Sequence, residues 1–251
     1  MEKATSSMTY LPNGQTKLII FDKDGTLIDF HAMWGGWITA LARRLAAHSY
    51  VNIDQQLYVR AGYDAARGTI DAGAPLAIGT MAELYALTVE VLLGAGLARA
   101  SAEAAAKAAW YIPDPVALAK PLAELPALFK GLRARGMRIA VATTDDRAPT
   151  EATLAALGVA PLLDGLACGD DGHAIKPAPD AVLKLCGQLG IAPAQAAVVG
   201  DTAADLRMAR AAGAGLAIGV LSGVGSRELL APLADVLLPS VAGLMEPVEN
   251  C

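Results

Sequence analysis

Short apolar runs at residues 18–21, 137–142 and 196–199 stand out along the chain, and each ends abruptly at a polar residue. A strand that is buried on both faces shows a continuous apolar run, whereas a half-exposed strand alternates. The three runs therefore predict buried strands of a parallel sheet. A helical pattern over about 122–135 precedes the second run and another begins at Asp180, so that strands and helices alternate as in an α/β domain.

The segment 30–113 differs from its surroundings, because it has helical patterns and no clear buried strand. We interpret it as a helical domain inserted into the α/β core, which would then consist of residues 1–29 and 114–251. An apolar stripe at helical spacing predicts a first helix in the insert, formed by Trp34, Trp37, Leu41 and Leu45. Further helices are expected over 53–67, ended by Gly68, over 80–93, ended by Gly94, and over 101–110, capped by Ser101.

Two aspartates follow the first apolar run, in the order Asp22, Lys23, Asp24, Gly25 and Thr26. Ligands of open α/β sheets bind at the carboxyl ends of the strands, so both carboxylates are expected at the mouth of a crevice. Taken alone, a polar turn after a strand explains this pattern equally well. A calcium-binding EF-hand loop does not fit, since two of its acidic positions would be occupied by an isoleucine and a histidine.

A second acidic pair decides between these interpretations. Asp201 follows the run 196–199, and Asp205 lies one turn into the next helix. Helix capping explains such residues in many proteins, and we keep it as a secondary role. Carboxylates at two strand ends of one domain favour a site for a hard cation such as Mg²⁺, with Asp22, Asp24, Asp201 and Asp205 as candidate ligands.

Candidate phosphate ligands lie between the two acidic pairs. Thr143 and Thr144 follow the run 137–142, where hydroxyls and free backbone N–H groups are available as a helix begins. Lys176 is followed by two prolines, which stiffen the backbone and remove hydrogen-bond donors. A lone lysine is normally a solvated surface charge, so Lys176 is a candidate only in the company of the aspartates.

The order of these residues resembles a known family. FDKDGT, VATT, the lysine of IKPAPD and VVGDTAADL are similar to the four motifs of the haloacid dehalogenase superfamily of phosphohydrolases, over roughly residues 17–220. The resemblance implies a Rossmann-like three-layer α/β core with a parallel sheet. It also implies that the insert is an α-helical cap of the C1 type, which closes over the site and selects substrates.

The resemblance implies a role for each candidate in the core. Asp22 would be the nucleophile and Asp24 the general acid and base. Thr143 and Lys176 would bind the phosphate. The motif that contains VVGDTAADL would supply the metal site.

Within that last motif, Asp201 would be a Mg²⁺ ligand and Asp205 would assist directly or through water. Thr144 departs from the family pattern, because many relatives carry asparagine there. Lys23 fills a variable position that is expected to point away from the site. The paired aspartates at 170–171 resemble an acidic turn that precedes the motif lysine in relatives, and we interpret them as structural.

The presence of Asp24 limits the branches of the superfamily to which the chain can be similar. Dehalogenase relatives need no metal and lack this aspartate, and phosphonate-cleaving relatives carry a small residue in its place. We therefore interpret the chain as a Mg²⁺-dependent phosphatase that hydrolyses a small-metabolite phosphomonoester through an aspartyl phosphate, with phosphoglycolate as the leading substrate. A sugar phosphomutase of the same superfamily and a non-catalytic phosphate-binding regulatory module are the alternatives.

Arg67 is the candidate for substrate contact in the insert, because C1-type relatives place a substrate-reading loop where Arg67, Gly68 and Thr69 form a turn. A guanidinium can bind a carboxylate through two parallel hydrogen bonds, which would suit a short phosphorylated acid. Complementing the dipole at a helix C-terminus is an equally good explanation. Arg60 is a possible assistant, and His31 is interpreted as a hinge or surface residue.

Composition agrees with a cytoplasmic enzyme that acts on a small phosphorylated metabolite. Alanine supplies much of the hydrophobic fraction of 54%, and no segment is suited to span a membrane. The net charge of −5 argues against a nucleic-acid partner, and residues 1–17 lack the apolar region of a secretory signal. Cys168, Cys186 and Cys251 are odd in number and widely separated, which argues against a disulfide framework or zinc site. The oligomeric state is left open.

Overall fold

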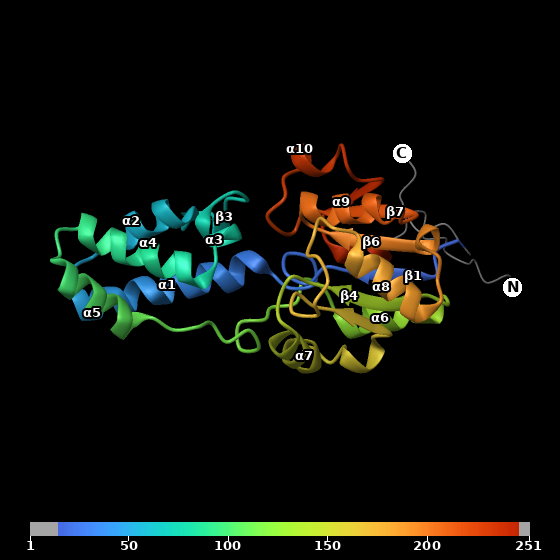
Figure 1. Ribbon diagram of the computed structural model, residues 1–251, viewed down its shortest axis with the longest axis horizontal. Coiled ribbons are helices and arrows are strands. Elements are labelled where there is room, and N and C mark those ends of the chain that lie inside the picture. Colours follow the sequence, from blue (N-terminus) through green and yellow to red (C-terminus); the bar gives the residue numbers. More distant parts are fainter. Residues whose placement is uncertain (1–14, 246–251) are drawn as a thin grey trace, which may run out of the picture. The chain divides into compact units, whose positions relative to one another are not determined.

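The computed structural model describes residues 15–245, in which the chain forms two compact units. The first unit joins the segment that ends at Asp29 to the segment that begins at Ala119, and the second unit is Phe30–Leu118. In Figure 1 the second unit contains the helices coloured blue to green, and the first contains β1 together with the later elements up to red. The helical insert thus interrupts the first unit directly after its first strand.

The second boundary falls five residues later than the position 113 expected from the sequence. Trp110, Tyr111 and Leu118 pack against the apolar core of the second unit. The indole N–H of Trp37 also donates to the carbonyl oxygen of Tyr111 at 3.2 Å. These contacts attach the linking segment to the helical unit.

A parallel sheet of six strands, in the order β5-β4-β1-β6-β7-β8, forms the centre of the first unit within residues 15–245. β1 lies between β4 and β6, with Phe21 opposite Val141 on one side and Val199 on the other. All four residues of β1 are fully buried, as the continuous apolar run predicts. The strands are β1 (Leu18–Phe21), β4 (Arg138–Ala142), β5 (Gly165–Ala167), β6 (Ala196–Gly200), β7 (Leu216–Val220) and β8 (Val236–Leu238).

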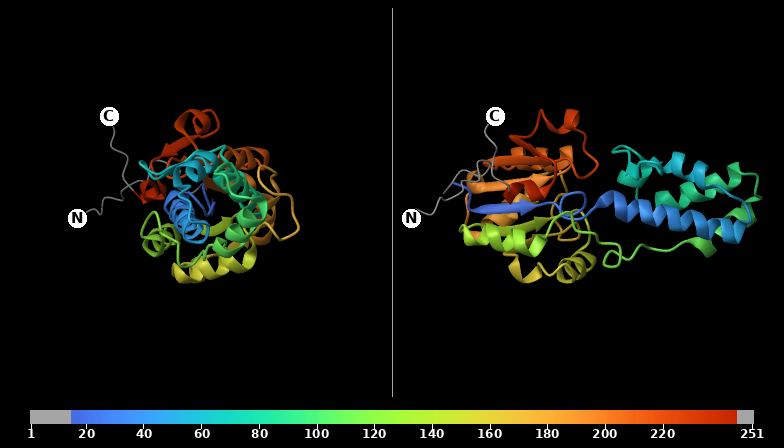
Figure 2. Two further views of the ribbon diagram at one scale, coloured as in Figure 1. Left: turned by 90° about the vertical axis from the view of Figure 1, so that its left-hand side faces the viewer. Right: turned by 180° about the vertical axis from the view of Figure 1, so that it is seen from behind.

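Helices cover both faces of this sheet, which confirms the predicted three-layer α/β fold (Figure 2). Ile19 and Phe21 of β1 face one apolar layer, and Leu18 and Ile20 face the other, because successive side chains of a strand alternate. The first layer contains α6 (Leu125–Ala134), α7 (Arg147–Ala156) and the 3-10 helix Val241–Met245. The second contains α8 (Asp180–Leu189), α9 (Ala203–Ala211) and α10 (Arg227–Leu230).

The second unit packs its helices around aromatic and aliphatic side chains. Trp37, Leu41 and Leu45 of the predicted stripe are fully buried in its core, and the ring of Trp37 meets those of Trp34 and Trp110 edge-on. A short antiparallel hairpin lies between the second and third helices. The elements are α1 (Phe30–Ser49), α2 (Asp54–Ala61), β2 (Tyr63–Asp64), β3 (Thr69–Ile70), α3 (Pro75–Ile78), α4 (Met81–Gly94) and α5 (Arg99–Ala109).

Two of the expected helices in this unit are wrong in their extent. The helix expected over 53–67 ends at Ala61, because Gly62 adopts φ +77 and closes the helix in a left-handed conformation before the hairpin. Ser101 does not cap the last helix, which begins two residues earlier at Arg99. Arginine and alanine are strong helix formers, so the helix extends past the serine without a polar cap.

Other expectations fall partly outside the described residues. Cys168 and Cys186 are buried free thiols, whereas Cys251 and residues 1–14 of the leader lie outside the described range. Among the residues that the structure describes, every helix is too short or too polar to cross a lipid bilayer.

Replacing Phe129 with alanine is expected to destabilise the first unit by about 3–5 kcal/mol. Phe129 is fully buried and stacks on Phe21 with 5.2 Å between ring centroids, so the truncation leaves a cavity beside the central strand. Urea unfolding followed by far-ultraviolet circular dichroism measures the loss. Leu229→Ala, at a half-exposed position of α10, is the control and should change stability by less than about 0.5 kcal/mol. Equal losses in the two variants would contradict the packing described here.

Candidate active site

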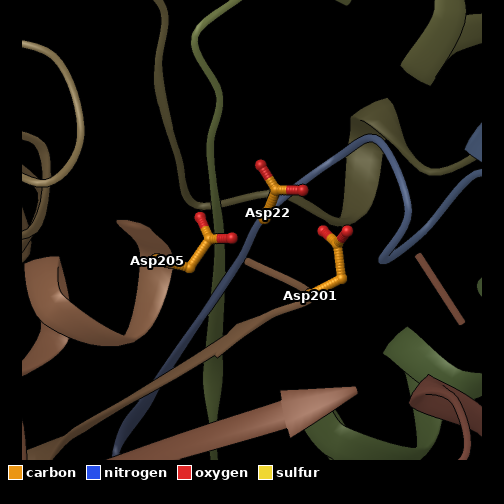
Figure 3. A group of neighbouring side chains, drawn as sticks. All are labelled: Asp22, Asp201 and Asp205. Atoms are coloured by element: carbon orange, nitrogen blue, oxygen red, sulfur yellow. The ribbon is translucent and has the colours of Figure 1, made fainter. Parts of the chain in front are cut away.

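Three buried carboxylates meet at the carboxyl ends of β1 and β6. In the described part of the chain, Asp22, Asp201 and Asp205 each offer an oxygen atom within 4.8 Å of those of the other two (Figure 3). Asp22 follows β1, Asp201 follows β6, and Asp205 lies in the first turn of α9. The backbone N–H of Asp22 donates to the carbonyl oxygen of Val199 at 2.8 Å, which extends the pairing of the two strands to the site. The fold therefore brings together three of the four predicted acidic residues.

Close backbone approach holds the carboxylate of Asp201. Its Oδ1 accepts a hydrogen bond from Thr26 Oγ1 at 3.3 Å, and its Oδ2 accepts one from the N–H of Val224 at 2.9 Å. Gly25 has φ +82, and a Cβ atom there would lie 2.4 Å from Asp201 Oδ2. A Cβ atom at Gly223 would lie 1.9 Å from the same oxygen. Both glycines are needed because a larger residue would displace the carboxylate.

Asp205 has two tasks, one for each carboxylate oxygen. Thr202 is the N-cap of α9, and its N–H donates to Asp205 Oδ2 at 3.0 Å, while its hydroxyl accepts from the N–H of Asp205 at 3.2 Å. This capping box shows the expected structural role of Asp205. Its Oδ1 is left for the acidic group and lies 2.7 Å from Lys176 Nζ.

Lys176 brings positive charge into the group. Its ammonium is ion-paired with both Asp22 and Asp205, and its side chain is only 7% exposed. Burial disfavours the ammonium, but Asp205 and Asp22 outweigh this and raise the pKa of Lys176 above its ordinary value. Lys176 is therefore a buried cation and not the solvated surface charge that a lone lysine usually is.

The charges of this group do not balance. Three carboxylates face one ammonium, so two negative charges are left when all groups are ionised. Burial raises the pKa of Asp22 to about 7, even though Lys176 acts in the opposite direction. Burial, together with Asp22, also raises the pKa of Asp201 well above its ordinary value. Oxygen donors with a surplus of two negative charges fit a hard divalent cation, so these residues could hold one.

The carboxylate of Asp24 does not join this group. Its Oδ2 lies 2.6 Å from the Nζ of Lys23, which also lies 2.8 Å from Asp145 Oδ2. Burial raises the pKa of Asp24, while Lys23 acts to lower it. The ion pair with Lys23 therefore sets Asp24 apart from the three carboxylates that could hold a metal ion.

The expectation that Lys23 points away from the site is wrong. Its side chain is 2% exposed, and its ammonium is ion-paired with the candidate Asp24 and with Asp145, in the loop after β4. Asp145 was not identified from the sequence. The signal for this contact is weak, since it consists only of a lysine between two aspartates and one more aspartate two residues after Thr143.

The two candidate threonines have different surroundings. Thr143 is buried at the end of β4, its N–H donates to the carbonyl oxygen of Ala167 at 2.9 Å, and its hydroxyl accepts from the N–H of Asp145 at 3.2 Å. Because β4 and β1 are adjacent parallel strands, Thr143 and Asp22 emerge at the same edge of the sheet. Thr144 is exposed.

The acidic turn at 170–171 is structural, as expected. Asp171 accepts hydrogen bonds from Nε and Nη2 of Arg147 and from the N–H of Cys168, and its Oδ2 lies 2.9 Å from Lys184 Nζ. Arg147 and these contacts lower the pKa of Asp171 against the opposing effect of burial. The turn joins the loop before Lys176 to α7 and α8.

Arg67 and His31 belong to the second unit. Arg67 lies in the turn of the β2–β3 hairpin, where its side chain is 81% exposed and its Nε is 3.8 Å from Asp64 Oδ2. It is therefore not at a helix C-terminus, which removes the expected alternative explanation for it. His31 connects α1 to the hairpin, because its Nδ1 accepts from the N–H of Ile70 at 3.1 Å.

Comparison with known proteins shows a family model and relatives that match this chain. The model of the haloacid dehalogenase-like hydrolases matches residues 16–213. The chain is 32% identical over 223 residues to a phosphoglycolate phosphatase of Rhodospirillum rubrum, an alignment that covers 86% of this chain and 84% of the relative.

Solved structures with the same fold are also found. A haloacid dehalogenase-superfamily hydrolase of subfamily IA from Geobacter sulfurreducens has a TM-score of 0.65 at 17% identity and covers 92% of this chain and 95% of its own. A family hydrolase from Deinococcus radiodurans, solved with bound phosphate and sodium, has a TM-score of 0.64 at 20% identity, over 93% of this chain and 99% of its own. At these identities the likeness shows the fold.

Without metal, the protein is expected to lose stability as the pH rises from about 4 to about 7. The folded state keeps a proton on Asp22 up to a pKa of about 7, whereas the unfolded chain releases it near 3.8, so the folded state binds more protons in this window. Thermal unfolding in the presence of a chelator measures the trend. Adding Mg²⁺ at pH 7.5 should raise the Tm, because the cation replaces the missing positive charge.

Asp201→Asn tests the same charge surplus. It should raise the metal-free Tm at pH 7.5 by about 2–4 °C, the shift that corresponds to 1 kcal/mol in a chain of this size, and should remove most of the Mg²⁺-induced increase. Asp146→Asn, at an exposed aspartate near the same edge of the sheet, is the control and should leave both values unchanged. A Mg²⁺ response that survives in Asp201→Asn would contradict a metal site in this group.

Proposed function

The chain belongs to the haloacid dehalogenase-like hydrolases, and on this premise we propose that it is a Mg²⁺-dependent phosphatase that hydrolyses a small phosphomonoester through an aspartyl phosphate on Asp22. The surroundings of Asp22 carry the proposal. Its buried carboxylate contacts the ammonium of Lys176 and lies beside Asp201 and Asp205 at the carboxyl edge of the sheet. A carboxylate can attack an anionic phosphate only when positive charge lies next to both groups. Lys176 and a cation held by the three carboxylates would supply that charge.

Asp22, Asp201 and Asp205 would hold the cation. When bound, Mg²⁺ would supply the positive charge that keeps Asp22 ionised and offsets the charge of the phosphoryl oxygens. The unbalanced negative charge of the acidic group supports this assignment. Within the described residues, Lys176 is also the one cationic or hydrogen-bonding partner of Asp205 Oδ1. We assign Asp24 to proton transfer only.

In the first half of the reaction, a carboxylate oxygen of Asp22 bonds to phosphorus while the bond between phosphorus and the ester oxygen breaks. Lys176 binds the phosphoryl oxygens through its charge, and Thr143 through its hydroxyl. Asp24 gives its proton to the leaving oxygen, which departs as the alcohol. Burial raises the pKa of Asp24, which favours the protonated form that this step needs.

In the second half, the oxygen of a water molecule attacks phosphorus, and the bond between phosphorus and Asp22 breaks. The carboxylate of Asp24 accepts the proton from that water, so it acts as a base where it has just acted as an acid. Orthophosphate leaves, Asp22 is again a carboxylate, and Asp24 is again protonated. The protein therefore returns to its starting state with one ester hydrolysed.

For the substrate, we propose a short phosphorylated carboxylic acid such as phosphoglycolate. The identity to the phosphatase of Rhodospirillum rubrum supports this choice. Within the second unit, Arg67 supports it too, because its guanidinium is mostly exposed and only loosely paired with Asp64, so it is available to a carboxylate.

Asp22→Asn is expected to lower turnover more than about 10³-fold, because the amide has nearly the shape of the carboxylate and cannot attack phosphorus. Orthophosphate release from an aryl phosphate, with Mg²⁺ and with chelator, measures the activity of both proteins. Beryllium fluoride, which imitates an acyl phosphate, should label Asp22 in the parent and nothing in the variant. A label on another residue would refute the nucleophile, and Mg²⁺-independent release would refute the metal. Transfer of phosphate to a sugar hydroxyl without release of orthophosphate would favour the phosphomutase alternative.

Arg67→Ala is expected to weaken turnover of carboxylated esters by about 10–100-fold in kcat/KM, the loss of a bidentate ion pair, and to spare esters without a carboxylate. A panel of small phosphomonoesters measures the selectivity. Arg99→Ala is the matched control, since Arg99 is also mostly exposed in the second unit but is paired with Glu103 at 3.4 Å. An unchanged selectivity in Arg67→Ala, or no preference for carboxylated esters in the parent, would remove Arg67 and phosphoglycolate from the proposal.

A further inference from the structure

We propose that Lys23 is a positioning residue that holds the carboxylate of Asp24 in place for proton transfer, with Asp145 as the second anchor of its ammonium. This inference rests on the proposed function, because it assigns a task within the same reaction. It concerns two residues, Lys23 and Asp145, that have no part in the reaction as described above.

The burial of Lys23 is the first argument. Lys23 is among the largest fully buried side chains of the described residues, and its side chain is 2% exposed. An ammonium in such a place is unfavourable unless it is paired, and an apolar residue of similar size would fill the same space with less penalty. Packing alone therefore does not explain a lysine at this position, so its charge has a use there.

The geometry around Nζ shows what that use is. Lys23 Nζ lies 2.6 Å from Asp24 Oδ2 and 2.8 Å from Asp145 Oδ2, so one ammonium joins two carboxylates that would otherwise repel each other. Asp24 Oδ1 is buried and has no hydrogen-bond partner among residues 15–245. The ion pair through Oδ2 thus restrains the direction of the Asp24 carboxylate.

The base of the lysine is fixed as well. The carbonyl oxygen of Lys23 accepts hydrogen bonds from the N–H of Leu27 at 2.8 Å and from the N–H of Ile28 at 3.0 Å. The N–H of Gly25 donates to the carbonyl oxygen of Ile28 at 2.7 Å and closes the turn. The backbone of Lys23 is thus restrained at one end of the side chain, and two carboxylates restrain the other end. The side chain therefore loses little further conformational freedom when it orients Asp24.

The two buried lysines of this edge serve different carboxylates. Lys176 is paired with Asp22 and Asp205, whereas Lys23 is paired with Asp24 and Asp145. The cation that would bind phosphate is therefore separate from the cation that holds the acid. Asp145 gives Lys23 a counter-ion of its own, so that the buried ammonium does not depend on Asp24 alone.

Lys23→Met is the test, since methionine fills a similar space without the charge. The kcat/KM value reports formation of the aspartyl phosphate and is measured for two esters, an alkyl phosphate and 4-nitrophenyl phosphate. The alkyl ester needs a proton on its leaving oxygen, so its kcat/KM should fall about 10²-fold, whereas the value for the nitrophenyl ester should fall less than about 3-fold. Asp24→Asn should show the same pattern, and the double variant should lose no more than Asp24→Asn alone, because both changes remove one function.

Lys184→Met is the matched control, because Lys184 is paired with another aspartate, Asp171, in the same unit. The ratio of the two kcat/KM values should not change in it. Circular dichroism shows whether Lys23→Met folds, and Lys23→Gln supplies the same comparison if it does not. The inference would be overturned by any of three results: equal losses for both esters, additive losses in the double variant, or faster turnover of the alkyl ester. Each of these results would leave the proposed function standing. A parent without activity on either ester in Mg²⁺ would overturn the proposed function, and this inference with it.

Discussion

The surplus of buried negative charge at the end of β1 is the constraint on which the site depends. Carboxylates repel one another in a protein interior, so Asp22, Asp201 and Asp205 stay together only because several elements hold them. The pairing of β1 with β6, the cap of α9 and the backbone N–H of Val224 fix their positions. Such rigidity is what a preorganised electrostatic site requires, since its charges then need not rearrange during the reaction.

Asp22 and Asp24 lie two positions apart in one turn but belong to two separate networks of ion pairs. Asp22 is ion-paired with Lys176, which lies between β5 and α8, whereas Asp24 shares Lys23 with a residue of the loop after β4. The central place of β1 makes this separation possible, because a strand with a neighbour on each side ends between two different loops. The nucleophile and the acid therefore reside in different electrostatic environments although they are two positions apart.

The sequence predicts what depends on local patterns. The apolar runs locate β1, β4 and β6, and the pattern over 80–93 locates α4, because burial leaves apolar residues at a fixed spacing. The hairpin at 63–70 was missed, since the left-handed Gly62 ends a helix whose pattern continues beyond it. The contact of Lys23 with Asp145 joins positions 122 residues apart, and no local pattern records such a pairing. The features that could not be predicted from the sequence are thus those that tertiary contacts determine.

The insertion of the second unit after β1 has a consequence for the order in which the protein can be assembled. The partner of Leu18 in β4 is Arg138, and the partner in β6 is Ala196, so the innermost strand leaves the ribosome long before either neighbour. At ~5–20 residues per second, the 120 residues between Leu18 and Arg138 take roughly 6–24 s to synthesise. During this interval the helical unit can complete its own core, whereas the fully apolar β1 has no sheet to join. Nascent chains of this architecture therefore carry an unpaired apolar strand until β4 has been synthesised.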